Sequence, residues 1–345
     1  MMADQPSTSG GRSPASRRRM LSLDEYEAGV RACDRSVLAR AITLVESRNP
    51  RHRSTAQELL TRLLPHTGEA IRVGITGVPG VGKSTFIDTL GSNLTSVGRR
   101  LAVLAVDPSS AVSGGSILGD KTRMERLCTD RHAFIRPSPS AGTLGGVAGR
   151  TRETMLLCEA AGFDVVLVET VGVGQSETVV AEMTDVFLAL MLPGAGDELQ
   201  GIKRGLLELV DLIVVNKADG DNRTRAQQAA RELRNALRFT HGGNDDRMPP
   251  VALCSATENH GVNDAWKCIE DIHSDAQVSG RLEARRKTQA VQWMWAMCDD
   301  VIRSRLHADP TLTQLRDDTE QQVRSGTLPP ALGAQRLLEA LGLTP

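Results

Sequence analysis

Apolar residues in the middle of the chain gather in short, nearly continuous runs, and longer stretches with helical spacing separate these runs. Strands that are apolar at every position are typical of a parallel sheet covered by helices on both faces, because neither face of such a strand meets water. The pattern predicts an α/β fold with a mainly parallel sheet. The predicted strands are Ile71–Thr76, Leu101–Asp107, Val165–Thr170, Val186–Leu192, Leu212–Val215 and Val251–Ser255.

Both flanks of this region predict helices instead. Between about residues 22 and 64 apolar residues recur every three or four positions, and Asn49-Pro50 marks a break between two helices. From about residue 275 the chain is helical and charged, and Asp309-Pro310 and Leu328-Pro329-Pro330 divide it into three helices. We therefore expect a tail over 1–20, an N-terminal helical extension over 21–68, a central domain over 69–272 and a C-terminal helical arm over 273–345.

The predicted arm carries an apolar stripe at helical spacing. Its members are Val291, Met294, Trp295, Cys298, Val301, Ile302 and Leu306. Such a stripe fits the core face of a single chain as naturally as it fits an intermolecular contact. Trp293 and Trp295 are expected to be exposed on this charged helix, and exposed tryptophans favour an interface. We therefore expect the arm to form a homodimer.

Composition narrows the class of protein. At 345 residues, with 40% hydrophobic and 24% charged residues, the chain is long enough for a full α/β domain and a smaller module. A net charge of −1 gives no reason to expect nucleic acid as a partner, and no apolar run approaches the roughly 20 residues of a membrane helix.

Two further features of composition concern the tail and the cysteines. The first 20 residues are rich in Ser, Pro, Gly and Arg and have no apolar segment, which excludes a secretory signal and favours a disordered tail over a transit peptide. The six cysteines form no CxxC or CxC pair. This favours reduced thiols in a cytoplasmic protein over disulfides or a zinc site.

The segment Gly77–Thr85, with the sequence GVPGVGKST, fits the phosphate-loop motif GxxxxGK[ST]. A predicted strand precedes it and a helix-compatible stretch over Ser84–Leu94 follows it, which is the context that this motif needs. Its glycines allow several backbone N–H groups to point at one polyphosphate beside a helix N-terminus. We expect Lys83 at the β- and γ-phosphates and the Ser84 hydroxyl at Mg²⁺. The other expected contacts are Gly77, Val78, Pro79, Gly80, Val81, Gly82 and Thr85.

A second motif, Asn216-Lys217-Ala218-Asp219, follows a predicted strand and indicates which base is bound. The Asp219 carboxylate can accept hydrogen bonds from N1–H and the exocyclic amine of guanine, and adenine lacks this pair of donors. The backbone of Cys254–Thr257, at the end of the last predicted strand, is a candidate for binding the guanine carbonyl. The two motifs together predict GTP/GDP rather than ATP as ligand. The expected base contacts are Asn216, Lys217, Asp219, Ser255, Ala256 and Thr257.

Candidates for binding the metal lie where predicted strands end. Asp107 ends the strand after the phosphate loop, and Asp120 lies in the following Gly/Ser-rich loop, Gly114–Met124. That loop fits a switch that senses the γ-phosphate and a solvated surface loop equally well. Glu169 ends another strand and is expected to hold Mg²⁺ directly or through a water molecule. The expected metal ligands are Ser84, Asp107, Asp120 and Glu169.

Two Gly-rich segments supply further candidates. After Glu169, we expect the Gly172 N–H to contact the γ-phosphate, and Gln175 is a candidate for orienting the attacking water. The connection Leu192–Gly205 is unusually long and Gly-rich, which is typical of functional or mobile loops, and Lys203 within it could contact a phosphate or a partner. The catalytic candidates are Lys83, Asp107, Glu169, Gln175 and Lys203.

Taken together, four parts of the chain resemble the MeaB/ArgK-type GTPases, which are chaperones of adenosylcobalamin-dependent methylmalonyl-CoA mutase. They are Gly77–Thr85, Val106–Met124, Glu169–Glu177, and Leu192–Gly205 joined to Asn216–Asp219. The resemblance runs from about residue 22 to the C-terminus. It implies a P-loop GTPase domain between N-terminal helices and a dimerisation arm. It also implies GTP hydrolysis coupled to loading, protection or repair of the cobalamin of the mutase.

The resemblance also implies roles for individual residues. It places Lys83, Ser84, Asp107, Asp120 and Glu169 at the phosphates and Mg²⁺, and Asn216, Asp219, Ser255 and Ala256 at the base. It makes the loop 194–205 an extra switch that signals to the mutase. No arginine finger is evident in the chain itself, so we expect slow intrinsic hydrolysis.

Two alternative functions stay open from the sequence. A metal-insertion GTPase of the nickel type would need ligands near the switch loops, and the nearest candidates, Cys128, His132 and Cys158, lack ligand spacing. A small-molecule P-loop kinase is the other alternative, and the guanine-specific motif argues against it.

Overall fold

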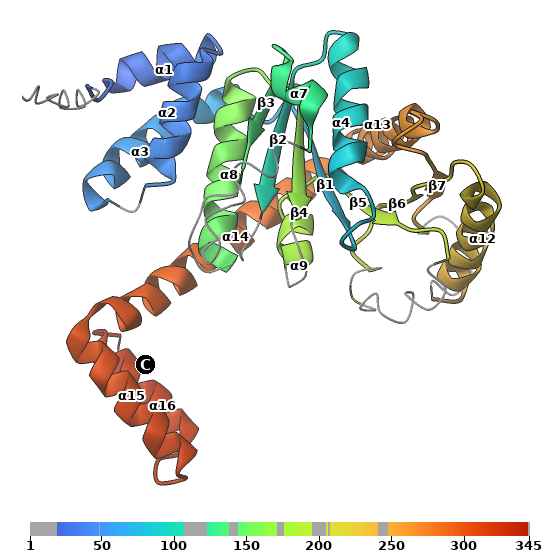
Figure 1. Cartoon of the computed structure of the whole chain (residues 1–345). Coiled ribbons are helices and arrows are strands. Elements are labelled where there is room, and N and C mark those ends of the chain that lie inside the picture. The colour runs from blue at the N-terminus through green and yellow to red at the C-terminus, as the bar shows by residue number, and fades with distance from the viewer. Residues whose placement is uncertain are drawn as a thin grey trace, which may run out of the picture.

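The computed structural model describes residues 19–47, 49–106, 123–137, 144–170, 176–194, 205, 208–240 and 248–343. Within these residues the centre of the molecule is a seven-stranded sheet in the order β3-β2-β4-β1-β5-β6-β7, with all neighbouring strands parallel (Figure 1). This confirms the predicted α/β fold. The strands are β1 (Ile71–Gly77), β2 (Leu101–Val106), β3 (Ala133–Arg136), β4 (Val165–Thr170), β5 (Val186–Met191), β6 (Leu212–Val215) and β7 (Val251–Leu253).

The sequence predicts six of these strands, and their ends agree to within two residues. It does not predict β3, the strand at the edge of the sheet beside β2. That strand has four residues, and only Ala133 and Phe134 among them are buried. A buried stretch of two residues is too short to stand out as an apolar run.

Alternate residues of each strand enter two separate cores. In β4, Val165 and Leu167 belong to one core, and Val166 and Val168 belong to the other. This alternation follows from the two-residue period of a strand, and it explains why the strands are apolar throughout. One face is covered by α4 (Lys83–Ser96), α7 (Glu125–Thr129) and α13 (Val262–Val278), and the other by α8 (Leu144–Ala160), α9 (Ser176–Ala181) and α12 (Asn222–Thr240).

In the described part of the chain before the sheet, three helices and a short 3-10 turn pack on α8. They are α1 (Leu23–Arg31), α2 (Arg35–Val45), α3 (Pro50–Leu63) and η1 (Leu64–His66). The predicted break at Asn49-Pro50 is confirmed, because Asn49 caps α3 and Pro50 is its first residue. The prediction of two helices misses a second break. Cys33 has a φ of 55°, and the Asp34 side chain accepts from the first N–H groups of α2.

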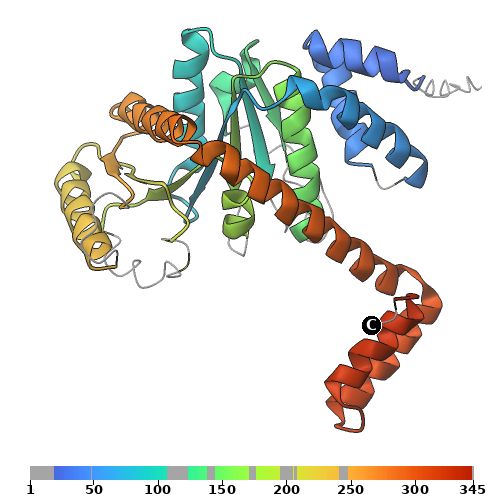
Figure 2. The same cartoon turned by 180° about the vertical axis from the view of Figure 1, so that it is seen from behind.

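The C-terminal part consists of α14 (Arg281–Ala308), α15 (Pro310–Arg324) and α16 (Pro330–Ala340), as the two proline breaks predict. The expected boundary after residue 272 falls inside α13, which ends at Val278. Helix α14 begins against the sheet and extends away from it, carrying α15 and α16 as a hairpin (Figure 2).

The two tryptophans of α14 differ in their surroundings. Trp295 is 62% exposed, as predicted, and Val291 and Met294 beside it are also exposed. The prediction is wrong for Trp293, which is half-buried. Its ring lies 5.9 Å from the Arg152 guanidinium of α8. A contact between residues so far apart in the chain cannot be predicted from the local sequence.

The six cysteines are free thiols, of which Cys158 and Cys254 are buried and Cys128 and Cys298 are exposed. Burial raises the pKa of the Cys254 thiol to about 12. Among the described helices, none is both long enough and apolar enough to cross a membrane.

Candidate functional site

The phosphate loop connects β1 to α4, and two of its glycines lie close to other segments, Gly77 to β5 and Gly82 to Asn216. Gly82, the N-cap of α4, has a φ of 94°, which glycine adopts without strain. A Cβ atom on Gly82 would lie 2.9 Å from Asn216 Nδ2, and one on Gly77 would lie 2.6 Å from the Leu190 carbonyl oxygen. The loop therefore needs glycine here both for backbone conformation and for space.

Lys83 and Ser84, the first residues of α4, lie beside a buried carboxylate. Lys83 Nζ donates to the Gly77 carbonyl oxygen at 2.7 Å. Burial lowers the pKa of Lys83, and the charges of Glu169 and Glu177 oppose this shift. Ser84 Oγ donates to Glu169 Oε1 at 3.3 Å. Hydroxyl and carboxylate oxygens are hard ligands of the kind that Mg²⁺ prefers, so the residues present fit this ion.

Glu169 is fixed in place by the sheet. It is the fifth residue of β4 and is 4% exposed. The next residue, Thr170, donates through Oγ1 to Thr76 Oγ1 at 3.0 Å and so links the ends of β4 and β1. Because the phosphate loop follows Thr76 directly, this contact sets the distance between the carboxylate and the loop.

Asn216 joins the phosphate loop to the segment that follows the last strand, β7. Its Nδ2 donates to the Val81 carbonyl oxygen at 2.8 Å, and its Oδ1 accepts from the Ala256 N–H at 3.1 Å. Cys254 Sγ also donates to this oxygen at 3.3 Å. Asn216 is 2% exposed, so all these contacts are shielded from water. The two sequence motifs are thus parts of one hydrogen-bonded unit.

The other candidates for base recognition lie near Asn216 in the chain and in space. Ser255 Oγ donates to Asp219 Oδ2 at 2.6 Å, which orients one carboxylate oxygen. Lys217 has a φ of 58°, an uncommon value for a residue with a side chain. Thr257 is exposed, while Ser255 is fully buried. The structure therefore brings Asn216, Asp219, Ser255 and Ala256 together directly.

Several predicted site residues lie outside the described residues. They are Asp107, Asp120, Gly172, Gln175 and Lys203. Val78, Pro79, Gly80 and Thr85 lie within the described phosphate loop and the first turn of α4.

Sequence reasoning did not single out three residues that support the site. Glu177, in the first turn of α9, is close enough for its charge to raise the pKa of Lys83. Thr89 of α4 donates through Oγ1 to the Ala256 carbonyl oxygen at 2.8 Å, and Thr76 accepts the contact from Thr170 described above. Their signal is weak in sequence because threonine and glutamate are common on any helix or strand.

The arrangement has the parts needed to bind and hydrolyse a nucleoside triphosphate. A Gly-rich loop, a lysine and a helix N-terminus form a polyphosphate site. A serine and a glutamate beside it can hold a divalent cation, and a carboxylate on an attached segment can accept from guanine. Hydrogen bonds connect these parts, so one nucleotide can contact all of them.

The chain is also similar in sequence to known GTPases. Residues 38–311 match the model of the family described as Methylmalonyl Co-A mutase-associated GTPase MeaB. The chain is 48% identical over 318 residues to the GTPase ArgK of Escherichia coli, with 92% of this chain and 96% of that protein covered. It is 44% identical over 328 residues to the mitochondrial Methylmalonic aciduria type A homolog of Mus musculus, with 92% and 79% covered.

A solved structure is also similar to this one. The structure titled as an LAO/AO transport system kinase superposes with a TM-score of 0.75 and is 40% identical in sequence. The match covers 94% of this chain and all of that one, so it includes the flanking helices as well as the sheet.

Proposed function

Because the chain belongs to the family of methylmalonyl-CoA mutase-associated GTPases, MeaB, and is a P-loop GTPase, we propose that it assists a methylmalonyl-CoA mutase in loading, protecting or reactivating its adenosylcobalamin. The main support for the binding of a guanine nucleotide is the Asn216–Val81 hydrogen bond, since it joins the guanine motif to the phosphate loop. The mutase part is supported by the description of the family and by the name of the mouse relative.

We assign the phosphate end of the site as follows. Lys83 binds the β- and γ-phosphates, and Ser84 and Glu169 hold Mg²⁺ with Asp107 and Asp120. When bound, this ion would neutralise charge on the phosphates. Gly172 contacts the γ-phosphate and Gln175 orients the attacking water. The Ser84–Glu169 contact supports the metal assignment, because both side chains already lie beside the phosphate loop.

The guanine end is assigned to Asn216, Lys217, Asp219, Ser255, Ala256 and Thr257. Asp219 accepts from guanine, and the Ser255 hydroxyl holds its carboxylate in position. Asn216 connects this end to the phosphate loop and is therefore a positioning residue as much as a contact.

We further propose that the protein is a homodimer formed through α14. Three large side chains on this helix, Val291, Met294 and Trp295, are each at least half exposed. Exposed apolar side chains gathered on one helix are typical of an interface. The arm would then place two GTPase domains beside one client.

The connection 194–205 is the proposed contact through which the nucleotide state is signalled to the mutase. Partner binding can respond to the nucleotide only if the partner has different affinities for the GTP and GDP states. Lys203 supplies a charge that the client could contact in one of these states.

The first test is GTP turnover by the purified protein, alone and with a methylmalonyl-CoA mutase from the same organism. We expect slow basal hydrolysis and clear stimulation by the mutase. Hydrolysis that does not respond to the mutase would contradict the mutase as the client but not the GTPase activity. A nickel-binding measurement would then test metal insertion.

A pair of lysine variants tests the signalling loop. Lys203→Ala should weaken stimulation more than basal hydrolysis, whereas Lys267→Ala, at an exposed position of α13, should leave both unchanged. An equal loss of both rates in Lys203→Ala would contradict the switch assignment.

A further inference from the structure

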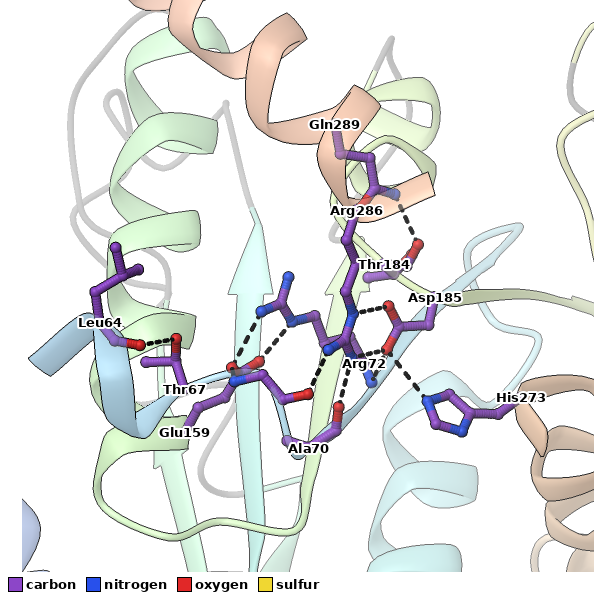
Figure 3. Close-up of polar contacts among 11 residues, drawn as sticks. Leu64, Thr67, Ala70, Arg72, Glu159, Thr184, Asp185, His273, Arg286 and Gln289 are labelled. Carbon is purple, nitrogen blue, oxygen red and sulfur yellow. Dashed lines mark hydrogen bonds and ion pairs between the residues drawn. The ribbon is translucent and has the colours of Figure 1, made fainter. Parts of the chain in front are cut away.

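A buried ion pair attaches the first turns of α14 to the edge of the sheet at which the strands begin (Figure 3). Asp185 precedes β5 and its side chain is 1% exposed. Arg286 binds it through two parallel hydrogen bonds, Nε to Oδ1 at 2.8 Å and Nη2 to Oδ2 at 2.7 Å. Such a paired geometry fixes direction as well as distance. His273 of α13 lies on another side, with Nε2 3.8 Å from Asp185 Oδ2.

Arg286 also contacts the chain that leads into β1. Its Nη1 donates to the Gly68 carbonyl oxygen at 2.5 Å, and its Nη2 donates to the Ala70 carbonyl oxygen at 2.8 Å. The Asp185 carboxylate in turn accepts from the Arg72 N–H at 2.9 Å. The guanidinium therefore holds the starts of β1 and β5 together.

The next two turns of α14 continue this contact on the same face. Gln289 is 9% exposed, and its Nε2 donates to the Thr184 carbonyl oxygen at 2.9 Å. Trp293 lies against the Arg152 guanidinium, whose Nη2 donates to the Glu182 carbonyl oxygen at 3.1 Å. Three successive turns of α14 thus hold the short connection between α9 and β5, directly or through Arg152.

The connection lies at the edge of the sheet where the strands begin, and α9 links it to the opposite edge, which carries the GTPase site. Only residues 171–175 separate α9 from Thr170, the last residue of β4, which follows Glu169. The last turn of α9 and the connection both lie against Gly74 of β1. A Cβ atom on Gly74 would lie 2.8 Å from both Val180 Cγ1 and Thr184 Oγ1. A shift of α9 would therefore press directly on the strand that leads into the phosphate loop.

Among the described residues, two donors at this junction, Arg152 Nε and Trp293 Nε1, are buried and have no hydrogen-bond partner. A buried donor without a partner is unfavourable, so this junction is less tightly determined than the fully paired contacts of Arg286. Another arrangement of α14 would therefore break fewer hydrogen bonds at Trp293 than at Arg286.

We infer that Arg286, Gln289 and Trp293 are positioning residues for GTP hydrolysis, and that they couple α14 to the GTPase site through the connection between α9 and β5. By this coupling a change in the arm alters the rate of hydrolysis, and the GTP and GDP states differ in how they hold α14. The inference rests on the GTPase activity alone and does not depend on which protein is the client.

The test compares two glutamines of α14 in the isolated full-length protein. Gln289→Met keeps the length of the side chain and removes the donor to Thr184, while Gln292→Met makes the same change at an exposed position. We expect Gln289→Met to change the single-turnover rate at saturating GTP by about fivefold or more, since the loss of one hydrogen bond, worth about 1 kcal/mol, corresponds to a factor of about five in rate. The Kd for GDP should stay within about twofold in both variants, and Gln292→Met should hydrolyse GTP as the wild type does.

Hydrogen exchange gives a second readout that needs no variant. Amides of α14 beyond Gln289 should exchange at different rates with GDP and with a non-hydrolysable GTP analogue, and Gln289→Met should reduce this difference. Equal exchange in both nucleotide states of the wild-type protein would overturn the coupling. A rate for Gln289→Met that matches Gln292→Met would overturn the positioning role.

Discussion

Asn216 Nδ2 lies 2.8 Å from the Val81 carbonyl oxygen, so the residue that begins the guanine motif hydrogen-bonds to the middle of the phosphate loop. The two residues are 135 positions apart in the chain. Because Asn216 also accepts from the Ala256 N–H, one side chain joins the three segments expected to surround the nucleotide. Any change at this position should affect the site as a whole.

Replacement of Asn216 by leucine should destabilise the protein and weaken the binding of all guanine nucleotides. The change leaves the Val81 carbonyl and the Ala256 N–H buried without partners, at about 1–3 kcal/mol for each group. Denaturant unfolding and titration with a fluorescent GDP measure the two effects. Unchanged stability with weaker binding would show that Asn216 only contacts the ligand and does not link the segments.

Asp219→Asn should change the base that is bound without a large loss of stability. The new amide can donate where the carboxylate accepted, which suits the second carbonyl of xanthine better than the amine of guanine. Competition between GDP and XDP measures the shift. Retained preference for guanine would exclude Asp219 as the residue that recognises the base.

Glu169→Gln should raise the Mg²⁺ concentration needed for half-maximal hydrolysis. The amide keeps the shape of the side chain beside Ser84 but removes the negative charge that attracts the ion. A Mg²⁺ titration of turnover measures the effect, and Glu169→Asp, which keeps the charge, is the matched control. If both variants have the Mg²⁺ dependence of the wild type, Glu169 is not a metal ligand.

Stability should fall as pH rises from about 4.5 to about 7 because of Glu153 on α8. Burial raises its pKa to about 7, while the charges of Arg150 and Arg53 oppose this shift. Asp300 lines the same cavity, of about 320 Å³, between α2, α3, α8 and α14. Within this window the unfolded chain releases the proton and the native protein keeps it, so rising pH favours unfolding.

The corresponding variant is Glu153→Gln, which cannot ionise. It should stabilise the protein at pH 8 by up to about 3 kcal/mol and change little at pH 4.5. Unfolding in denaturant at both pH values measures this, with Glu232→Gln at an exposed position of α12 as control. Equal effects of Glu153→Gln at both pH values would mean that packing, and not titration, is responsible.

Trp295→Glu should separate the proposed dimer. A charge placed among Val291, Met294 and their counterparts in a second copy would have to be buried without a partner. Light scattering after gel filtration measures the mass, and Gln292→Glu is the control at a neighbouring exposed position. A wild-type protein that elutes as a monomer at micromolar concentration would contradict the dimer itself.

The sequence predicts the sheet well because its strands are buried on both faces. In β4 and β6 every residue is buried, and both strands have the predicted ends. The phosphate loop and the guanine motif are predictable for a different reason. Their residues are close in the chain and have fixed spacing, so the requirement of the ligand is visible locally.

The features that the sequence does not predict depend on contacts between distant segments. The break at Cys33 requires a positive φ at a residue that does not favour it, and the short strand β3 is recognisable only from its pairing with β2. The half-burial of Trp293 depends on Arg152, which is far away in the chain. Asn216 is identified from sequence as a base contact, while its hydrogen bond to Val81 becomes visible only in the fold.

The ion pair between Arg286 and Asp185 bears on how the chain can be shortened. A fragment ending at Gly280 would retain all seven strands and the whole phosphate loop, yet the buried Asp185 carboxylate would lose its counter-charge. Removing one partner of a buried pair costs several kcal/mol, typically about 3–5. The shortest autonomous GTPase fragment therefore extends past the last strand into α14, and the arm begins within the same folding unit as the sheet.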